Sequence, residues 1–215
     1  MSTKSPDAVP AASGPPEVPA SLARTAAGVR TPVADVALVA TLAAFIAVCA
    51  ILPSFPVAGL AVPITLQTFG VMLAGVLLGA RRGALAVLLY LAVGLAGLPV
   101  FAQGTGGLAV LGKPSAGYLL AFPLAAALAG FLVTRVRRVP TRWLPLAVFG
   151  AATAGSLVFT HPIGIAVMGA RQGLSATEAV TAGAVFLPGD LIKNALVAIV
   201  ATAVFRAFPD MLERR

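Results

Sequence analysis

Residues 184–205 read AVFLPGDLIKNALVAIVATAVF, a hydrophobic run long enough to cross a bilayer that nevertheless contains Asp190 and Lys193. A helix that crosses the hydrocarbon core needs about 20 apolar residues, and a charged side chain near the bilayer centre costs roughly 2.5–3.5 kcal/mol. The two charges are three residues apart, so a helix brings them to nearly the same face. This span is therefore the first place where the sequence predicts a ligand site.

The composition of the whole chain indicates a membrane protein. Of its 215 residues, 59% are hydrophobic and 10% are charged, whereas a soluble protein carries about 25% charged residues. Four runs contain no Asp, Glu, Lys or Arg, namely 36–80, 83–112, 114–134 and 143–170. We predict an all-α, polytopic membrane protein whose six transmembrane helices lie near residues 36–52, 64–80, 83–98, 116–134, 144–168 and 184–207.

The net charge of +8 is better explained by orientation in the membrane than by nucleic-acid binding. With a cytoplasmic N-terminus, 12 of the 15 basic residues lie inside, Lys113 and Arg171 lie outside, and Lys193 lies within a span. The inner residues are Lys4, Arg24, Arg30, Arg81, Arg82, Arg135, Arg137, Arg138, Arg142, Arg206, Arg214 and Arg215. This asymmetry follows the positive-inside rule, so we expect a multi-pass protein of the cell membrane with both termini cytoplasmic and no nucleic-acid partner.

The remaining segments are predicted to be irregular. Residues 1–35 are rich in Pro, Ala and Ser, which favours a disordered cytoplasmic tail, followed by a membrane domain over 36–207 and a cytoplasmic tail over 208–215. Three prolines break 53–63, so this segment is not a continuous helix. Seven glycines and two prolines within 94–117 predict an irregular outer loop between helices three and four, of the kind that lines a cavity.

Two readings of Asp190 and Lys193 are open. They form either an ion pair that neutralises itself and fixes helix packing, or a ligand site in which Asp190 accepts N–H groups and Lys193 donates to an oxygen. Asp190 falls in the first turn after Pro188, where the helix dipole favours an anion.

Two motifs that suggest enzymes are rejected. Residues 107–113 read GLAVLGK, the core of a phosphate-binding loop, but Pro114 replaces the Ser or Thr that would hold Mg²⁺. Ser156 and His161 suggest an intramembrane hydrolase, but five residues on an α-helix separate two side chains by about 140°. His161-Pro162 is more simply read as a kink or a helix end. With one Cys and one His in the chain, we expect no zinc site and no cofactor.

Tyr90 and Tyr118 are further candidates for ligand binding, and small residues are candidates for helix contact. Tyr90 and Tyr118 are the two tyrosines, and each hydroxyl seeks a partner when buried; an interfacial aromatic belt would suit Tyr118 better than Tyr90. Small residues four apart, such as Ala40 and Ala44, let another helix approach closely. That helix belongs either to the same bundle or to a partner subunit.

Several motifs resemble, in order and spacing, those of the BioY family. They cover roughly 36–207 and read VPITLQT (62–68), GARRG (79–83), Tyr90, GLAGLPVFA (94–102), PSAGYL (114–119) and PGDLIK (188–193). The family usually has GPTGGY where residues 113–118 read KPSAGY.

This resemblance implies a six-helix substrate-binding S component of an energy-coupling factor (ECF) transporter. Such a protein takes biotin from outside and works in the lipid bilayer with a transmembrane coupling subunit and two ATPase subunits, so the chain itself is not expected to be an enzyme. The resemblance places ligand binding on Asp190, Lys193 and, through the loop after LPVF, Gln103. It places contact with the coupling subunit on the Ala-rich first helix, at Ala40 and Ala44.

The chemistry of biotin fits these residues. Asp190 and Lys193 would meet the ureido edge, while Tyr90, Leu98 and Phe101 would cover the apolar body. The carboxylate would reach loop N–H groups or Lys113, although the reverse orientation, with the carboxylate on Lys193, also satisfies the sequence. An S component for another vitamin and an integral-membrane enzyme are the rival functions, and the enzyme lacks a nucleophile or metal cluster in the sequence.

Overall fold

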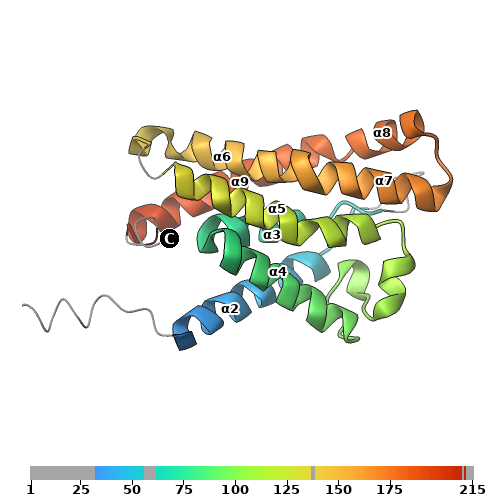
Figure 1. Ribbon diagram of the computed structural model, residues 1–215, viewed down its shortest axis with the longest axis horizontal. Helices are drawn as coiled ribbons and strands as arrows, with labels where there is room; N and C mark the ends of the chain where they lie inside the picture. The colour runs from blue at the N-terminus through green and yellow to red at the C-terminus, as the bar shows by residue number, and fades with distance from the viewer. Residues whose placement is uncertain (1–31, 56–61, 137–138, 210, 212–215) are drawn as a thin grey trace, which may run out of the picture. The chain divides into compact units, whose positions relative to one another are not determined.

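The computed structural model describes residues 32–55, 62–136, 139–209 and 211, and these residues form helices linked by short irregular segments (Figure 1). The long elements are α2 (Pro32–Ile51), α3 (Gln67–Leu78), α4 (Ala80–Leu95), α5 (Ala116–Arg135), α6 (Leu144–Gly155), α7 (His161–Gln172), α8 (Ala176–Ala184) and α9 (Leu187–Ala207). The short ones are the 3₁₀ turns η1 (Ala102–Gly104), η2 (Leu108–Gly112) and η3 (Thr141–Trp143), and the π turn η4 (Ser156–Thr160).

Four helical stretches are long and apolar enough to cross a membrane: Pro32–Ile51, Ala116–Arg135, Thr141–Gln172 and Leu187–Ala207. The predicted spans 64–80 and 83–98 correspond to shorter helices, α3 with 12 residues and α4 with 16. Helix α3 begins only at Gln67, after Pro63. Helix α4 stops at Leu95 because Gly97 adopts a left-handed φ of 115°, a conformation that ends a helix.

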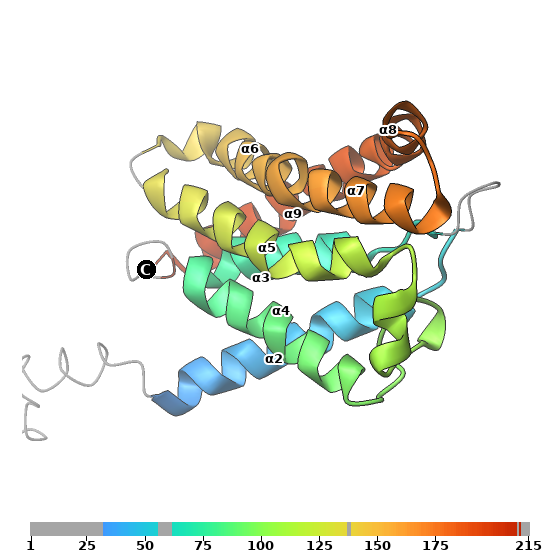
Figure 2. The ribbon, with the colours of Figure 1, turned by 45° about the vertical axis from the view of Figure 1, so that its right-hand side comes forward.

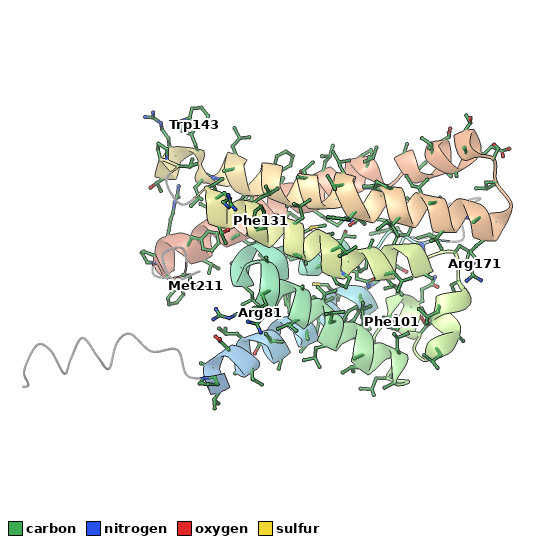
Figure 3. The ribbon with its side chains drawn as sticks, viewed as in Figure 1. Arg81, Phe101, Phe131, Trp143, Arg171 and Met211 are labelled. Atoms are coloured by element: carbon green, nitrogen blue, oxygen red, sulfur yellow. The ribbon has the colours of Figure 1, made fainter. Side chains whose placement is uncertain are left out.

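Helices α3 and α5 lie between α2 with α4 on one side and α6, α7 and α9 on the other (Figures 1 and 2). Arg81, Trp143 and Met211 lie toward one end of this bundle, and Arg171 lies at the opposite end (Figure 3). The starts of α5 and α9 and the whole of α8 lie at the end that carries Arg171.

The backbones of α3, α4 and α5 touch at three glycines, which we call the glycine joint: Gly75, Gly83 and Gly130. A Cβ added at any of the three would come closer than 3.0 Å to backbone atoms of a neighbouring segment. Small residues permit such close helix contact in membranes. Helix α2 is attached more loosely, since only Ala43, Ile46, Cys49 and Ala50 are buried in it.

Of the two outcomes expected at His161-Pro162, a kink or a helix end, the helix end is wrong. The helix continues through both residues, and the irregularity is the π turn η4, in which the His161 N–H donates to the Ser156 carbonyl five residues earlier. A π turn contains one more residue than an α-helical turn. Ser156 and His161 therefore do not lie about 140° apart as on an α-helix; both are buried and both contact α9.

Helix α8 was not predicted, although its start carries a recognisable signal. Ser175 and Glu178 form a capping box, in which the Glu178 N–H donates to Ser175 Oγ and the Ser175 N–H donates to the Glu178 carboxylate. The Ser175 hydroxyl, which donates to the same carboxylate, and the Ser175 N–H together lower the pKa of the exposed Glu178 carboxyl. The turn from α8 into α9 places Phe186 beside Tyr118, with ring centroids 5.8 Å apart.

Candidate binding site

A cavity of about 250 Å³ lies at the end of the bundle where α5 and α9 begin. Its walls come from residues 62–68 before and at the start of α3, from residues 101–115, from the first two turns of α5, and from Phe186 and the start of α9. Five of the seven residues predicted to bind a ligand line it: Asp190, Lys193, Gln103, Phe101 and Tyr118. The cavity thus gathers residues from distant parts of the sequence.

Asp190 is the buried anion of this cavity, and both of its carboxylate oxygens contact other protein side chains. Oδ1 lies 2.6 Å from Lys193 Nζ and accepts a hydrogen bond from Thr68 Oγ1 at 2.9 Å. Oδ2 lies 3.1 Å from Nε2 of His161. The carboxylate is compensated from three helices, as a buried charge has to be.

The Lys193 ammonium is fully engaged within the protein. Besides Asp190 it donates to the Thr65 carbonyl at 3.0 Å and to Thr68 Oγ1 at 2.8 Å. An ammonium group has three N–H donors, so all three have partners. A ligand oxygen can bind Lys193 only by replacing one of these contacts.

The polar contacts continue from Asp190 one turn along α9. Asn194 Nδ2 donates to Ser156 Oγ at 3.2 Å and to Thr153 Oγ1 at 3.4 Å. Asn194 and Ser156 are both buried. Helix α9 is thereby joined to α6 and the π turn by side-chain hydrogen bonds directly behind the cavity.

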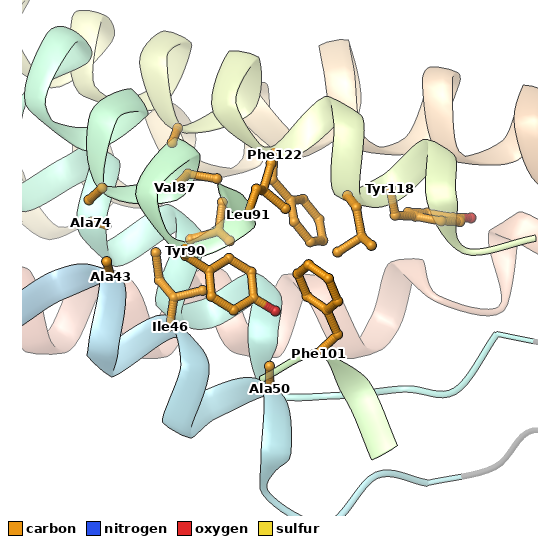
Figure 4. Packing of buried hydrophobic residues seen from close by; sticks show 14 of the residues in the cluster. Ala43, Ile46, Ala50, Ala74, Val87, Tyr90, Leu91, Phe101, Tyr118 and Phe122 are labelled. Carbon is orange, nitrogen blue, oxygen red and sulfur yellow. The ribbon is translucent and has the colours of Figure 1, made fainter. Parts of the chain in front are cut away.

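Tyr90 lies behind the cavity wall and not in it. Its hydroxyl accepts from Gln67 Nε2 at 2.8 Å and donates to the Val100 carbonyl at 3.2 Å. Its ring meets Phe101 edge to face, with centroids 5.4 Å apart (Figure 4). Tyr90 was predicted to cover a ligand, and in this structure it supports the lining residues Gln67 and Phe101 from behind.

Tyr118 differs from Tyr90 in its hydroxyl. The residue is 92% buried and lines the cavity, yet its hydroxyl has no hydrogen-bond partner in the described part of the chain. Its ring lies against Gly164, where an added Cβ would strike it, and Figure 4 shows the hydroxyl pointing away from the aromatic cluster. Tyr118 is thus no interfacial aromatic-belt residue.

The irregular segment between α4 and α5 brings Phe101 to the cavity and leaves Leu98 outside it. An isolated bridge joins Phe101 to Thr105, and between them Gln103 has a left-handed φ of 61°. Phe101 packs on Gly94 of α4. Leu98, for which a ligand contact was predicted, is 52% exposed and does not line the cavity.

The phosphate-loop-like residues 107–113 form the 3₁₀ turn η2 and lead directly into α5. Lys113 is exposed and lines the cavity. Arg171 of α7 donates to the Leu111 carbonyl at 3.3 Å and so ties this turn to the bundle. Among the described residues, no three His, Cys, Asp or Glu side chains gather as a metal site would require.

Sequence reasoning missed three contributors to the site: Thr65, Thr68 and His161. The two threonines lie in the motif at 62–68, but hydroxyl and carbonyl groups in an apolar run give no signal by themselves. A histidine inside a membrane span is a signal, because such residues are rare and usually functional. The π turn concealed its contact with Asp190, because α-helical spacing would direct His161 away from the side on which Ser156 contacts α9.

Comparison with known proteins gives consistent matches. The sequence model of the BioY family matches residues 21–210. The chain is 40% identical over 177 residues to the biotin transporter BioY of Rhizobium etli, which covers 81% of this chain and 95% of that protein. It is 39% identical over 190 residues to the biotin transporter BioY of Rhodobacter capsulatus, covering 84% and 98%. A crystal structure of the S component for biotin from an ECF-type ABC transporter matches with a TM-score of 0.76 and 29% identity, covering 83% of this chain and 95% of that one.

Proposed function

The chain belongs to the BioY family, and we propose that it is the substrate-binding S component of a biotin uptake transporter. It takes biotin at the outer face of the cell membrane and delivers it inward. The observation that carries this proposal is the cavity, which has mostly apolar walls, the buried Asp190–Lys193 pair, and the exposed Lys113. Small-ligand sites combine apolar walls with a few placed polar groups in this way.

The groups of biotin find counterparts in the cavity. The ureido ring has two N–H donors and one carbonyl, which suit Asp190 and a donor such as the Tyr118 hydroxyl. The thiophane ring is apolar and suits the Phe101 and Phe122 side chains, and the carboxylate suits Lys113. Because Lys193 has no spare N–H, the ureido carbonyl reaches it only by displacing Thr65 or Thr68.

Isothermal titration calorimetry of the purified protein tests which vitamin it binds. Biotin is expected to bind, while thiamine, riboflavin and other vitamins of unrelated shape are not. Binding of another vitamin with biotin inert would replace the substrate and keep the transport class. Biotin amide tests orientation: with the carboxylate at the exposed Lys113 the amide loses little affinity, whereas a carboxylate buried at Lys193 makes the loss large.

The topology follows from the helices and the charges. In the proposed arrangement six segments cross the membrane, α3 and α4 together with the four longer stretches, both termini are cytoplasmic, and residues 96–115 lie outside. Cysteine labelling in intact cells tests it after Cys49 is replaced. An impermeant reagent should label Leu108→Cys and spare Arg142→Cys, both of which are exposed positions; the opposite pattern inverts the topology.

The exposed face of α2 is the proposed contact with the transmembrane coupling subunit, which works with two ATPase subunits that hydrolyse ATP. Ala40 and Ala44 are exposed, whereas Ala43 of the same helix is buried. Ala40→Leu and Ala44→Leu should therefore keep biotin affinity and abolish ATP-driven uptake, because a bulky side chain prevents close helix contact. The matched control is Ala203→Leu, at an exposed alanine of α9. Normal uptake in both α2 variants, or binding lost together with uptake, would exclude this face.

A further inference from the structure

His161 is the single histidine of the chain and is buried within the membrane region. It lies at the first position of α7, directly after the π turn, and Nε2 is 3.1 Å from Asp190 Oδ2. Both ring nitrogens are buried and neither makes a well-aligned hydrogen bond among the described residues, so the 3.1 Å contact with the carboxylate is the feature that distinguishes Nε2 from Nδ1. A proton on Nε2 would face a carboxylate oxygen, whereas a proton on Nδ1 would be a buried donor without a partner, which is costly.

The two oxygens of Asp190 are not equivalent. Oδ1 receives both Lys193 and Thr68, whereas Oδ2 is approached by His161 alone. A carboxylate offers about four lone-pair sites, two on each oxygen. With Oδ1 filled, the site left for a ligand N–H is on Oδ2, the oxygen that His161 contacts.

We propose that His161 is a positioning residue for ligand binding: it donates Nε2–H to Asp190 Oδ2 and so directs the remaining acceptor site of Asp190 into the cavity. The part of this proposal that concerns a ligand rests on the proposed function. The π turn provides the means, because its extra residue brings His161 onto the same side as Ser156, facing α9. Single π turns of this kind occur frequently at functional sites.

A pair of near-isosteric variants separates this role from packing. His161→Gln keeps an N–H donor at about the position of Nε2, and His161→Met fills the same space without a donor. We expect His161→Gln to bind biotin within threefold of the wild type and His161→Met to bind at least tenfold more weakly. If the two variants bind equally, the donor is irrelevant and the proposal is overturned.

The same pair in an Asp190→Asn background tests whether His161 acts through Asp190. With the carboxylate gone, the difference between Gln and Met at position 161 should fall below twofold. A difference that stays tenfold would mean that His161 meets the ligand directly, which contradicts a positioning role.

A measurement without biotin distinguishes failure of this inference from failure of the proposed function, and it needs no variant of His161. Because the chain has one histidine, ¹⁵N-histidine labelling gives one imidazole spin system in the full-length protein. The expected spectrum shows a proton on Nε2, and Asp190→Asn should shift its resonance. A neutral imidazole with its proton on Nδ1, or a spectrum unaffected by Asp190→Asn, overturns the contact even if biotin binds. If biotin does not bind while the Nε2 proton is present, the substrate is wrong and the contact stands.

Discussion

Tyr90 and Tyr118 are both buried in the same aromatic cluster, but their hydroxyl groups are in opposite situations. The Tyr90 hydroxyl both accepts and donates within the protein. Tyr118 lines the cavity, but its hydroxyl is buried and has no partner among the described residues. A buried polar group is normally satisfied, so an unsatisfied one beside a cavity indicates where a ligand supplies the partner. The hydrogen bonds of the Tyr90 hydroxyl are therefore complete in the free protein, whereas we expect the Tyr118 hydroxyl to gain its partner when a ligand binds.

Asp190 and Lys193 test this comparison most severely, because they line the cavity like Tyr118 yet already have partners within the protein, as Tyr90 does. We expect Asp190→Asn and Lys193→Met each to weaken biotin binding tenfold or more. A hydrogen bond to a charged group contributes about 1.5–3 kcal/mol, and a tenfold change in affinity is about 1.4 kcal/mol. Calorimetry on folded variants is the measurement.

The control for these substitutions is Thr202→Val, which changes a buried polar residue of α9 that does not line the cavity and should bind biotin normally. If the pair serves structure alone, the single variants will fail to accumulate as folded protein and the double variant will partly recover. Unchanged affinity in a folded single variant removes that residue from the site.

Tyr90→Phe should lower thermal stability and leave the affinity for biotin within about twofold. The change deprives Gln67 Nε2 and the Val100 carbonyl of their partner, and an unsatisfied buried group costs about 1–3 kcal/mol. The ring contact with Phe101 is retained. Thermal unfolding in detergent, followed by calorimetry, measures both effects; a tenfold loss of affinity at unchanged stability would return Tyr90 to the binding surface.

Tyr118→Phe should show the reverse pattern. Its hydroxyl makes no hydrogen bond to any described residue of the free protein, so stability should be unchanged or slightly higher. Loss of one neutral hydrogen bond to the ligand, about 0.5–1.5 kcal/mol, corresponds to a two- to tenfold weaker affinity. Equal affinity of Tyr118→Phe and wild type would mean that biotin leaves this hydroxyl unpaired.

The smallest effect is expected at Leu98. Leu98→Ala changes a half-exposed side chain away from the cavity, and such surface changes usually stay within about 0.5 kcal/mol. Affinity and stability should both match the wild type. A tenfold loss of binding would show that residues 96–100 move onto the ligand.

The sequence allowed an all-helical membrane protein to be predicted, and it singled out the two charged residues of α9 that line the cavity, for a physical reason that holds at particular residues. Charge-free runs locate spans because charge is costly in hydrocarbon, and the same cost singles out Asp190 and Lys193. The family motifs added Gln103, which does line the cavity, and the family assignment itself is confirmed by the matched residues 21–210.

The features that could not be predicted depend on the exact position of each residue along its helix. The directions of the Tyr90 and Leu98 side chains depend on where α4 ends, and the end of α4 depends on the left-handed conformation of Gly97. The contact between His161 and Asp190 depends on one extra residue in a helical turn, which composition and periodicity do not reveal. Helix α8 was recoverable, since Ser175 and Glu178 have the spacing of a capping box.

The glycine joint restricts how the cavity can change size. Helices in backbone contact have no side chains between them to repack, so α3, α4 and α5 can neither slide nor part without opening a void. Thr68 lies on α3, as Gly75 does, and is therefore held in place with that helix. If a ligand displaces a partner of the Lys193 ammonium group, as proposed above, the adjustment is expected in α9, in the chain around Thr65 and in residues 96–115. The three helices of the glycine joint would then form the rigid side of the cavity, and the segments opposite them would form its adjustable side.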